Sequence, residues 1–460
     1  MVQNKITQGS IPKQLLAFFF PIWVGTFFQQ LYNTVDAVIV GNFVGKEALA
    51  AVGGPTGTII NLMVGFFVGM SSGAGVVIAQ YYGARREDET SKAVHTAMAL
   101  ALWGGVMLTV CGLVFSPTLL RSMGTPESVM QHATAYIRIY FAGTVFNLIY
   151  NIGSGILRAV GDSKRPLYFL MICSGCNVVL DILFVAVLQM GVTGAALATI
   201  LSQAVSAGLV LLSLTNVESV YRLHLSKIKL DFCILGRIIH IGLPAGLQSV
   251  MYSVSNIVIQ ASINGFGLDT VAAWTAYGKI DGLFWMTISS FGTAITIFVG
   301  QNFGAGFYDR VKKSVRICFV MSAAVTVVLS SALLLGGPYL YRLFTDDEKV
   351  IALGIEIMRF LVPYYFTYVA IDILSGAMRG AGDGIVPMII TCIGVCVLRV
   401  IWISFAVPMW PTLKTACFSY PLTWSITSVA FVVYYIQGSW LRRHIPPVQE
   451  TVQKEESLAK

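Results

Sequence analysis

The sequence predicts an all-α polytopic membrane protein built from two similar halves, and three observations support this. Of the 460 residues, 56% are hydrophobic and only 11% are charged, whereas a soluble domain carries about 25% charged residues. The apolar runs are long and continuous rather than alternating, which favours helices over a barrel. A charged turn motif occurs twice, which indicates two similar halves.

The duplication is clearest in two turns that connect apolar stretches, 155–166 and 376–387. The offset is 376 − 155 = 221 residues, close to half the chain, which predicts two copies of one structural unit. We interpret the charged residues of both turns as structural clamps. The identical positions are Gly155/Gly376, Arg158/Arg379, Gly161/Gly382, Asp162/Asp383 and Pro166/Pro387.

Each half supplies six apolar runs that can cross a membrane, since a spanning helix needs about 20 apolar residues. The twelve expected spans are 14–40, 48–82, 92–117, 128–155, 166–188, 192–215, 235–264, 270–302, 313–336, 350–377, 385–408 and 413–438.

The distribution of Lys and Arg predicts the orientation. One set of helix ends carries 21 of the 30 residues and the other set carries seven, while Lys279 and Arg399 lie inside spans. Because positive residues favour the cytoplasmic side, we expect both termini in the cytoplasm. The two halves then point the same way, related by an axis along the membrane normal.

The longest polar stretch between spans, 216–234, is the expected link between the halves. The expected domains are an N-terminal six-helix lobe at 1–215, a cytoplasmic linker at 216–234, a C-terminal six-helix lobe at 235–440 and a cytoplasmic tail at 441–460.

Several motifs occur together. They are Pro21 and Asp36 in the first span, A-L-A-A-V-G at 48–53, Q-Y-Y-G-A at Gln80–Ala84, both G-x-x-R-x-x-G-D-x-x-x-P turns, and G-V-T-G-A-A-L-A-T at Gly191–Thr199. Over about residues 10–440 the chain resembles the multidrug and toxic-compound extrusion (MATE) transporters of bacteria, and it is most similar to their DinF-type branch. The resemblance implies twelve transmembrane helices in two pseudo-symmetric six-helix lobes around a central cavity. It also implies alternating access, export driven by Na⁺ or H⁺, and location in a bacterial inner membrane.

Two acids in the first half, Asp36 and Asp181, lie inside spans. Inserting an ionisable side chain into a membrane costs about 2.5–3.5 kcal/mol. Asn177 precedes Asp181 by one helical turn, so the two side chains share a face. The resemblance to the DinF-type branch adds Thr199 and implies that Asp36, Asn177, Asp181 and Thr199 form a cation-coupling site. Oxygen ligands suit a hard cation such as Na⁺, and two close carboxylates can hold a shared proton. The alternative is that Asp36 and Asp181 only cap or bridge helices.

The second half does not repeat this set, because the offset of 221 places Leu398, Trp402 and Tyr420 at the positions of Asn177, Asp181 and Thr199. We therefore assign coupling to the first lobe. The second half has its own group of charges within spans, which favours a structural ion-pair network, with a proton-linked or substrate-linked switch as the alternative. This group is Lys279, Asp281, Asp372 and Arg399.

Two helical stripes are candidates for the substrate cavity, with plain helix packing as the alternative. Aromatic faces beside an acid suit an organic cation, and a polar stripe in a span must face a cavity or a neighbouring helix. The aromatic stripe is Tyr364, Tyr368 and Asp372, and the polar stripe includes Gln248, Tyr252 and Asn256.

The sequence contains no G-x-x-x-x-G-K-[ST], no H-E-x-x-H and no plausible Ser/His/Asp set. We therefore expect no enzyme activity, no cofactor, no nucleotide and no nucleic-acid partner. The expected function is a secondary antiporter that exports amphipathic or cationic organic compounds in exchange for H⁺ or Na⁺. We expect a monomer whose partners are small organic substrates and membrane lipid.

The sequence gives less support to two other functions. A lipid-linked oligosaccharide flippase of the same broad superfamily should line its cavity with several basic residues, but only Lys279 and Arg399 lie inside spans. A membrane-embedded lipid enzyme should show clustered polar groups near one interface, and the sequence shows none.

Overall fold

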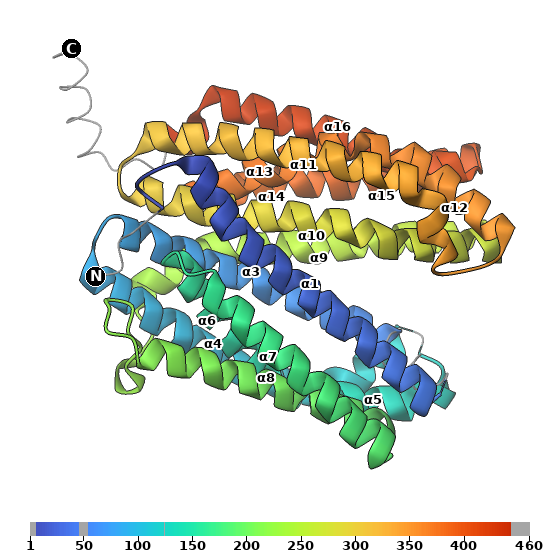
Figure 1. Cartoon of the computed structure of the whole chain (residues 1–460), viewed down its shortest axis with the longest axis horizontal. Coiled ribbons are helices and arrows are strands. Elements are labelled where there is room, and N and C mark those ends of the chain that lie inside the picture. Colours follow the sequence, from blue (N-terminus) through green and yellow to red (C-terminus); the bar gives the residue numbers. More distant parts are fainter. Residues whose placement is uncertain (1–5, 46–53, 124, 443–460) are drawn as a thin grey trace. The chain divides into compact units, whose positions relative to one another are not determined.

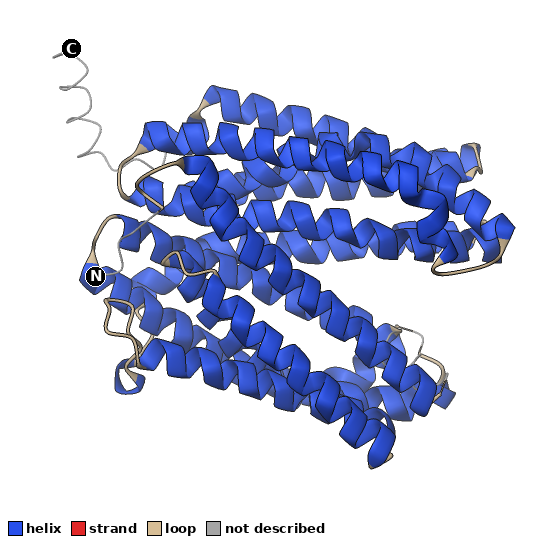
Figure 2. Cartoon of the chain, viewed as in Figure 1, coloured by secondary structure: helices blue, strands red, loops and turns tan. Residues whose placement is uncertain are grey.

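The protein is all-helical in the part described by the computed structural model, which comprises residues 6–45, 54–123 and 125–442 (Figure 1, Figure 2). Eleven helices in these ranges are long and apolar enough to cross a membrane. The prediction of an all-α polytopic membrane protein is confirmed. The motif at 48–53, the start of the second expected span and the tail from 443 onward lie outside the described residues.

Packing divides the chain into two compact units, Met1–Val250 and Met251–Lys460. The elements of unit 1 are α1 (Ile11–Phe43), α3 (Pro55–Gly83), α4 (Glu87–Ser122), α5 (Glu127–Ala142), α6 (Thr144–Ala159), α7 (Lys164–Asp181), the π-helix Ile182–Val187, α8 (Gly191–Thr215) and the 3-10 turn Leu225–Lys227. Helix α9 (Phe232–Asn264) begins in unit 1 and ends in unit 2.

Unit 2 continues from α9 to the end of the described chain. Its elements are α10 (Leu268–Gly304), α11 (Tyr308–Arg342), α12 (Glu348–Leu361), the 3-10 turn Val362–Tyr364, α13 (Tyr365–Ala381), α14 (Ile385–Thr391), the π-helix Cys392–Val397, α15 (Leu398–Met409), α16 (Leu413–Gln437) and α17 (Ser439–Arg442). The packing boundary falls inside α9, whereas the boundary expected from the repeat lies at 216–234. The assignment of lobes from the repeat stays a prediction.

The repeated turns owe their shared residues to backbone geometry. Gly161 has φ of 98° and Gly382 has φ of 105°, a region that L side chains rarely adopt. The Asp162 carboxylate accepts the backbone N–H groups of Lys164 and Arg165 at the start of α7. Asp383 accepts the Tyr434 hydroxyl at 2.7 Å. Asp162 therefore holds the start of α7, and Asp383 ties its turn to α16, in keeping with the clamp interpretation.

The fourth and tenth spans are broken, although the sequence predicted continuous helices at 128–155 and 350–377. Helix α5 ends at Ala142 and α6 starts at Thr144, with Gly143 between them. A Cβ on Gly143 would lie 2.5 Å from Ile200 of α8, so the break lies at a close helix contact. In the second half, Pro363 lies in the 3-10 turn between α12 and α13, where its missing N–H interrupts the α-helical bonds.

Candidate functional site

The four residues proposed for cation coupling all lie in unit 1. Asp36 is in the second half of α1, Asn177 and Asp181 are in the last turns of α7, and Thr199 is in α8. Helix α1 packs against α7 and α8, and α7 packs against α8 (Figure 1). The Asp36 and Asp181 carboxyl groups lie within range of electrostatic interaction with each other.

Burial separates Asp181 from ordinary surface acids, while Asp36 is half-buried. Asp181 is 0% exposed and Asn177 is 1% exposed. Within the described residues, the Asp181 oxygens, the Asn177 side-chain atoms and Asp36 Oδ1 have no hydrogen-bond partner. An unpaired buried polar atom costs about 1–3 kcal/mol and calls for a bound partner. The chemistry of these oxygens fits a proton or a small hard cation.

A tyrosine that could not be identified from the sequence lies beside these polar side chains. Tyr136 of α5 is 4% exposed, and its hydroxyl lies within interaction range of both the Asp36 carboxyl and the Thr199 hydroxyl. The Thr199 hydroxyl itself donates to the Ala195 carbonyl at 3.0 Å. No periodic pattern marks Tyr136, because its role depends on how α5 packs against α8.

Apolar side chains pack around Tyr136, next to these polar groups. One buried cluster joins α1, α5, the π-helix and the start of α8, through Ile39, Val40, Tyr136, Val185, Val192, Ala195 and Ala196. The π-helix begins directly after Asp181, and π-helical insertions frequently occur at functional sites. Such packing limits the access of water and strengthens electrostatic interactions at the acid pair.

The second unit places Asp281 among aromatic donors rather than beside a base. Trp285 Nε1 and the Tyr365 hydroxyl both donate to its carboxylate. The hydroxyls of Tyr277 and Tyr365 lie 2.8 Å apart. This acid is therefore held by neutral donors from α10 and α13.

Arg399 is also buried, with 2% of its surface exposed. Its Nη2 donates to Thr423 Oγ1 at 3.1 Å, and its guanidinium lies 4.1 Å from the Tyr420 ring centroid. Lys279 is exposed. Among the residues described, no ion pair joins Lys279, Asp281, Asp372 or Arg399 to one another, since the pairs found are Asp162–Arg165, Arg342–Glu348 and Glu356–Lys414. The expected ion-pair network is therefore absent from the described residues, and neutral or aromatic partners take the place of a charged one at Asp281 and Arg399.

The aromatic stripe expected at Tyr364, Tyr368 and Asp372 does not lie on one continuous α-helix. Tyr364 ends the 3-10 turn and is 37% exposed, whereas Tyr368 is 6% exposed. The Tyr368 hydroxyl lies 3.1 Å from the Tyr252 hydroxyl, and its ring packs edge-on against Trp285 and Trp424. The structure thus brings Tyr252 and Tyr368 together and separates Tyr364 from them.

The other cavity candidates differ in burial. Gln248, the one candidate that belongs to unit 1, is 8% exposed, and Asn256 is exposed. The Asp372 carboxylate lies against Gly292 of α10, in the space that a side chain there would fill. Among the described residues its Oδ2 has no hydrogen-bond partner.

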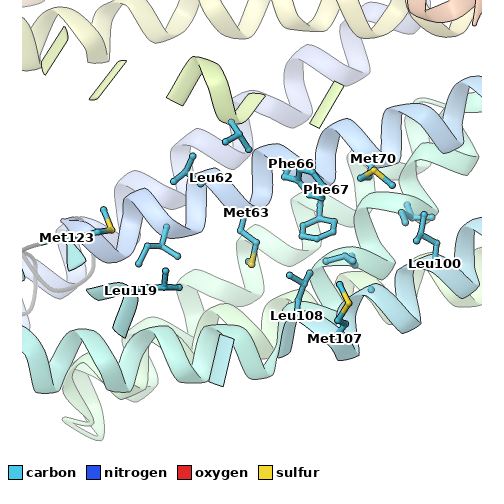
Figure 3. Close-up of a pocket in the computed structure, with 15 residues that line it drawn as sticks. Leu62, Met63, Phe66, Phe67, Met70, Leu100, Met107, Leu108, Leu119 and Met123 are labelled. Atoms are coloured by element: carbon cyan, nitrogen blue, oxygen red, sulfur yellow. The ribbon is translucent and has the colours of Figure 1, made fainter. Parts of the chain in front are cut away.

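Unit 1 also contains an apolar cavity of about 560 Å³, within the range of about 300–1,000 Å³ usual for ligand pockets. Figure 3 shows side chains of α3 and α4, among them Phe66 and Met107, converging on it. The lining includes four methionines and two phenylalanines. It shares no residue with the acid pair. The lining residues are Ile59, Leu62, Met63, Phe66, Phe67, Met70, Leu100, Gly104, Met107, Leu108, Leu119, Met123, Leu148, Ile152 and Val250.

Comparison with known proteins decides the family. The family model described as MatE matches residues 21–183 and again residues 244–403. The chain belongs to the MATE family. Two matches to one model agree with the duplication seen in the sequence, and the chain is a MATE transporter rather than an enzyme.

Curated MATE relatives match along nearly the whole chain. The chain is 29% identical to the probable multidrug resistance protein YpnP of Bacillus subtilis over 439 residues, covering 94% of this chain and 97% of the relative. It is 26% identical to the probable multidrug resistance protein YoeA of the same organism, covering 97% of each.

Solved MATE structures share the fold. One is described as the outward-facing conformation of a multidrug resistance MATE family transporter, with TM-score 0.88, 25% identity and coverage of 96% of this chain and 99% of that chain. Another is a transporter of the MOP superfamily from Pyrococcus furiosus, for which a reversed polarity of the binding pocket suggests a different function. Its TM-score is 0.89, with 25% identity and the same coverage.

Proposed function

We propose that this MATE transporter exports amphipathic or cationic organic compounds in exchange for Na⁺ or H⁺. The observation that carries the proposal is the pair Asp36 and Asp181, whose carboxyl groups lie near each other and have three oxygens without a hydrogen-bond partner among the described residues. The names of the relatives, multidrug resistance and multidrug export proteins, support the substrate class.

Coupling follows from the energetics of this site. A bound ion drives export only if it favours one state of the transporter and the substrate favours the other. Two neighbouring carboxylates repel when both are ionised, and a proton or Na⁺ removes that repulsion. Helix α1 could then repack, with Pro21 as the point where a backbone hydrogen bond is missing. Asn177 and Thr199 would supply neutral oxygen ligands.

The set Asp36, Asn177, Asp181 and Thr199 also supports assignment to the DinF-type branch. Other MATE branches carry an acid in the seventh span, and residues 242–267, which cover most of that span here, contain none. For the coupling ion, the test is purified protein in proteoliposomes with Na⁺ and pH gradients imposed separately. Dye export under one gradient identifies the ion, and no export under either gradient contradicts the proposed function.

We further propose a multi-pass protein of the bacterial inner membrane with both termini in the cytoplasm. The bias of Lys and Arg supports this orientation. Cysteine introduced at Asp346, in the loop before α12, should react with an impermeant thiol reagent added outside the cell. Protection at that site, together with labelling from outside of a cysteine at Lys227, would mean the opposite orientation.

A further inference from the structure

The first part of α9 is attached to unit 1 by a close helix contact that the repeat does not predict. Three glycines of α3 at four-residue spacing, Gly65, Gly69 and Gly73, run along α9 in the opposite direction. A Cβ on Gly73 would lie 2.5 Å from the Gly242 nitrogen, and one on Gly69 would collide with the Gly246 backbone. Small residues at this spacing let two helix backbones touch within a membrane.

The glycines of α9 are equally constrained. A Cβ on Gly246 would lie 2.7 Å from the Phe66 carbonyl oxygen, and one on Gly242 would lie 3.0 Å from the Met70 Cα. Phe66, Met70 and Val250 also line the apolar cavity. The α3–α9 contact therefore sets one wall of that cavity.

Polar bonds continue the same contact at the helix ends. Arg237 of α9 donates to the Tyr81 hydroxyl at 2.6 Å and to Gln80 Oε1 at 3.2 Å, and its guanidinium lies 4.8 Å from the Tyr81 ring centroid. This explains part of the Q-Y-Y-G-A motif, which supplies both acceptors. Planar, two-armed recognition of this kind suits arginine better than lysine.

The segment before α9 is held to unit 1 as well. The backbone N–H of Asp231 donates to Thr96 Oγ1 at 3.2 Å, and that of His224 donates to His95 Nε2 at 3.1 Å. The Asp231 carboxylate accepts the N–H groups of Cys233 and Ile234 and so caps the start of α9. The stretch from His224 to Val250 is thus bonded to α3 and α4 at successive points.

We propose that Arg237 is a positioning residue which, with the glycine contact, keeps the first part of α9 attached to α3 throughout the transport cycle. The start of α9 then moves with unit 1 although the repeat assigns it to the second half. The inference rests on the proposed transport function, but the contact itself can be measured without transport.

A disulfide across this contact tests the proposal. A Cβ on Gly65 would lie 3.3 Å from the Ser249 Cβ, close to the Cβ separation of about 3.5–4.5 Å in disulfides. Gly65→Cys/Ser249→Cys should cross-link on oxidation and still export dye at a rate within about twofold of the same protein after reduction, as expected of a contact that stays closed. Wild type treated in the same way controls for the eight native cysteines.

Two results would overturn the proposal. One is a cross-linked protein that stops transporting and recovers on reduction, since the contact would then have to open. The other is a folded protein that fails to cross-link. If the reduced variant and wild type both lack transport, the proposed function fails while the cross-linking yield still reports the contact.

A second variant isolates the role of Arg237. Arg237→Ala in the same double-cysteine background should slow disulfide formation at least about fivefold without loss of folded protein, because its two bonds to α3 are gone. Arg237→Lys should restore only part of the rate. An unchanged cross-linking rate in Arg237→Ala would show that the arginine does not position α9.

Discussion

The carboxyl group of Asp36 on α1 lies within interaction range of that of Asp181 at the end of α7, and neither acid takes part in an ion pair among the described residues. Like charges so close in a buried site are costly unless a proton or cation intervenes. The arrangement is therefore poised to respond to an ion.

Tyr136→Phe should weaken the apparent affinity for the coupling ion by about tenfold while the protein stays folded, because a hydroxyl next to Asp36 and Thr199 is lost. The measurement is the dependence of dye export on ion concentration in proteoliposomes. Tyr168→Phe, at a tyrosine that is 55% exposed, is the matched control. Equal ion dependence in Tyr136→Phe and Tyr168→Phe would remove Tyr136 from the site.

Tyr368→Ala should lower the free energy of unfolding by about 3–5 kcal/mol, because a buried ring between Trp285 and Trp424 is removed. Tyr368→Phe keeps the ring and loses only the bond to Tyr252. It should stay folded and change the relative resistance to different compounds if this face meets substrate. Thermal unfolding in detergent and resistance profiles measure the two effects. An unchanged profile in Tyr368→Phe would favour helix packing alone.

Gly69→Ala should destabilise the protein by about 1–3 kcal/mol, because the added methyl meets the α9 backbone. Gly236→Ala, on α9 itself, is the control, since nothing lies within 4 Å of the added atom. Alanine there should be neutral or stabilising by up to about 1 kcal/mol. Thermal unfolding compares the two, and equal midpoints would mean that α3 and α9 do not pack this closely.

The polar segment before α9 should loosen on acidification. The rings of His95 and His224 stack with centroids 6.2 Å apart. Desolvation, then the charges of Lys227 and Arg222, lowers the pKa of His224 below its usual range. The folded segment thus binds fewer protons than the unfolded one. Its stability is fully present above the usual pKa near 6.5 and is lost as the pH falls through the folded-state pKa.

Hydrogen exchange at the His224 amide, corrected for the intrinsic rate, should show weaker protection at about pH 5.5 than at about pH 7.5. His224→Gln should reduce this difference, whereas His132→Gln, at an exposed site on α5, should preserve it. Protection that does not change with pH would contradict the prediction.

Several features could be predicted from the sequence because they repeat or carry a large energetic cost. Helices followed from apolar runs, and Asp36 and Asp181 stood out because charges are rare in spans. Tyr136, the π-helix after Asp181 and the break at Gly143 could not be predicted, since each depends on contacts between distant helices. Tyr364 left its stripe because Pro363 converts that turn to a 3-10 geometry.

The most direct test of the coupling site is dye export driven by an imposed ion gradient in Asp36→Asn and Asp181→Asn. Asparagine mimics the protonated acid, so both variants should fold and export at least about tenfold more slowly than wild type. Thr199→Ala should show a milder loss. Asp346→Asn, at an exposed acid before α12, should match wild type. Export at the wild-type rate by both Asp36→Asn and Asp181→Asn would contradict the coupling role of these two acids, and Asp281, Asp372 and Arg399 would become the candidates.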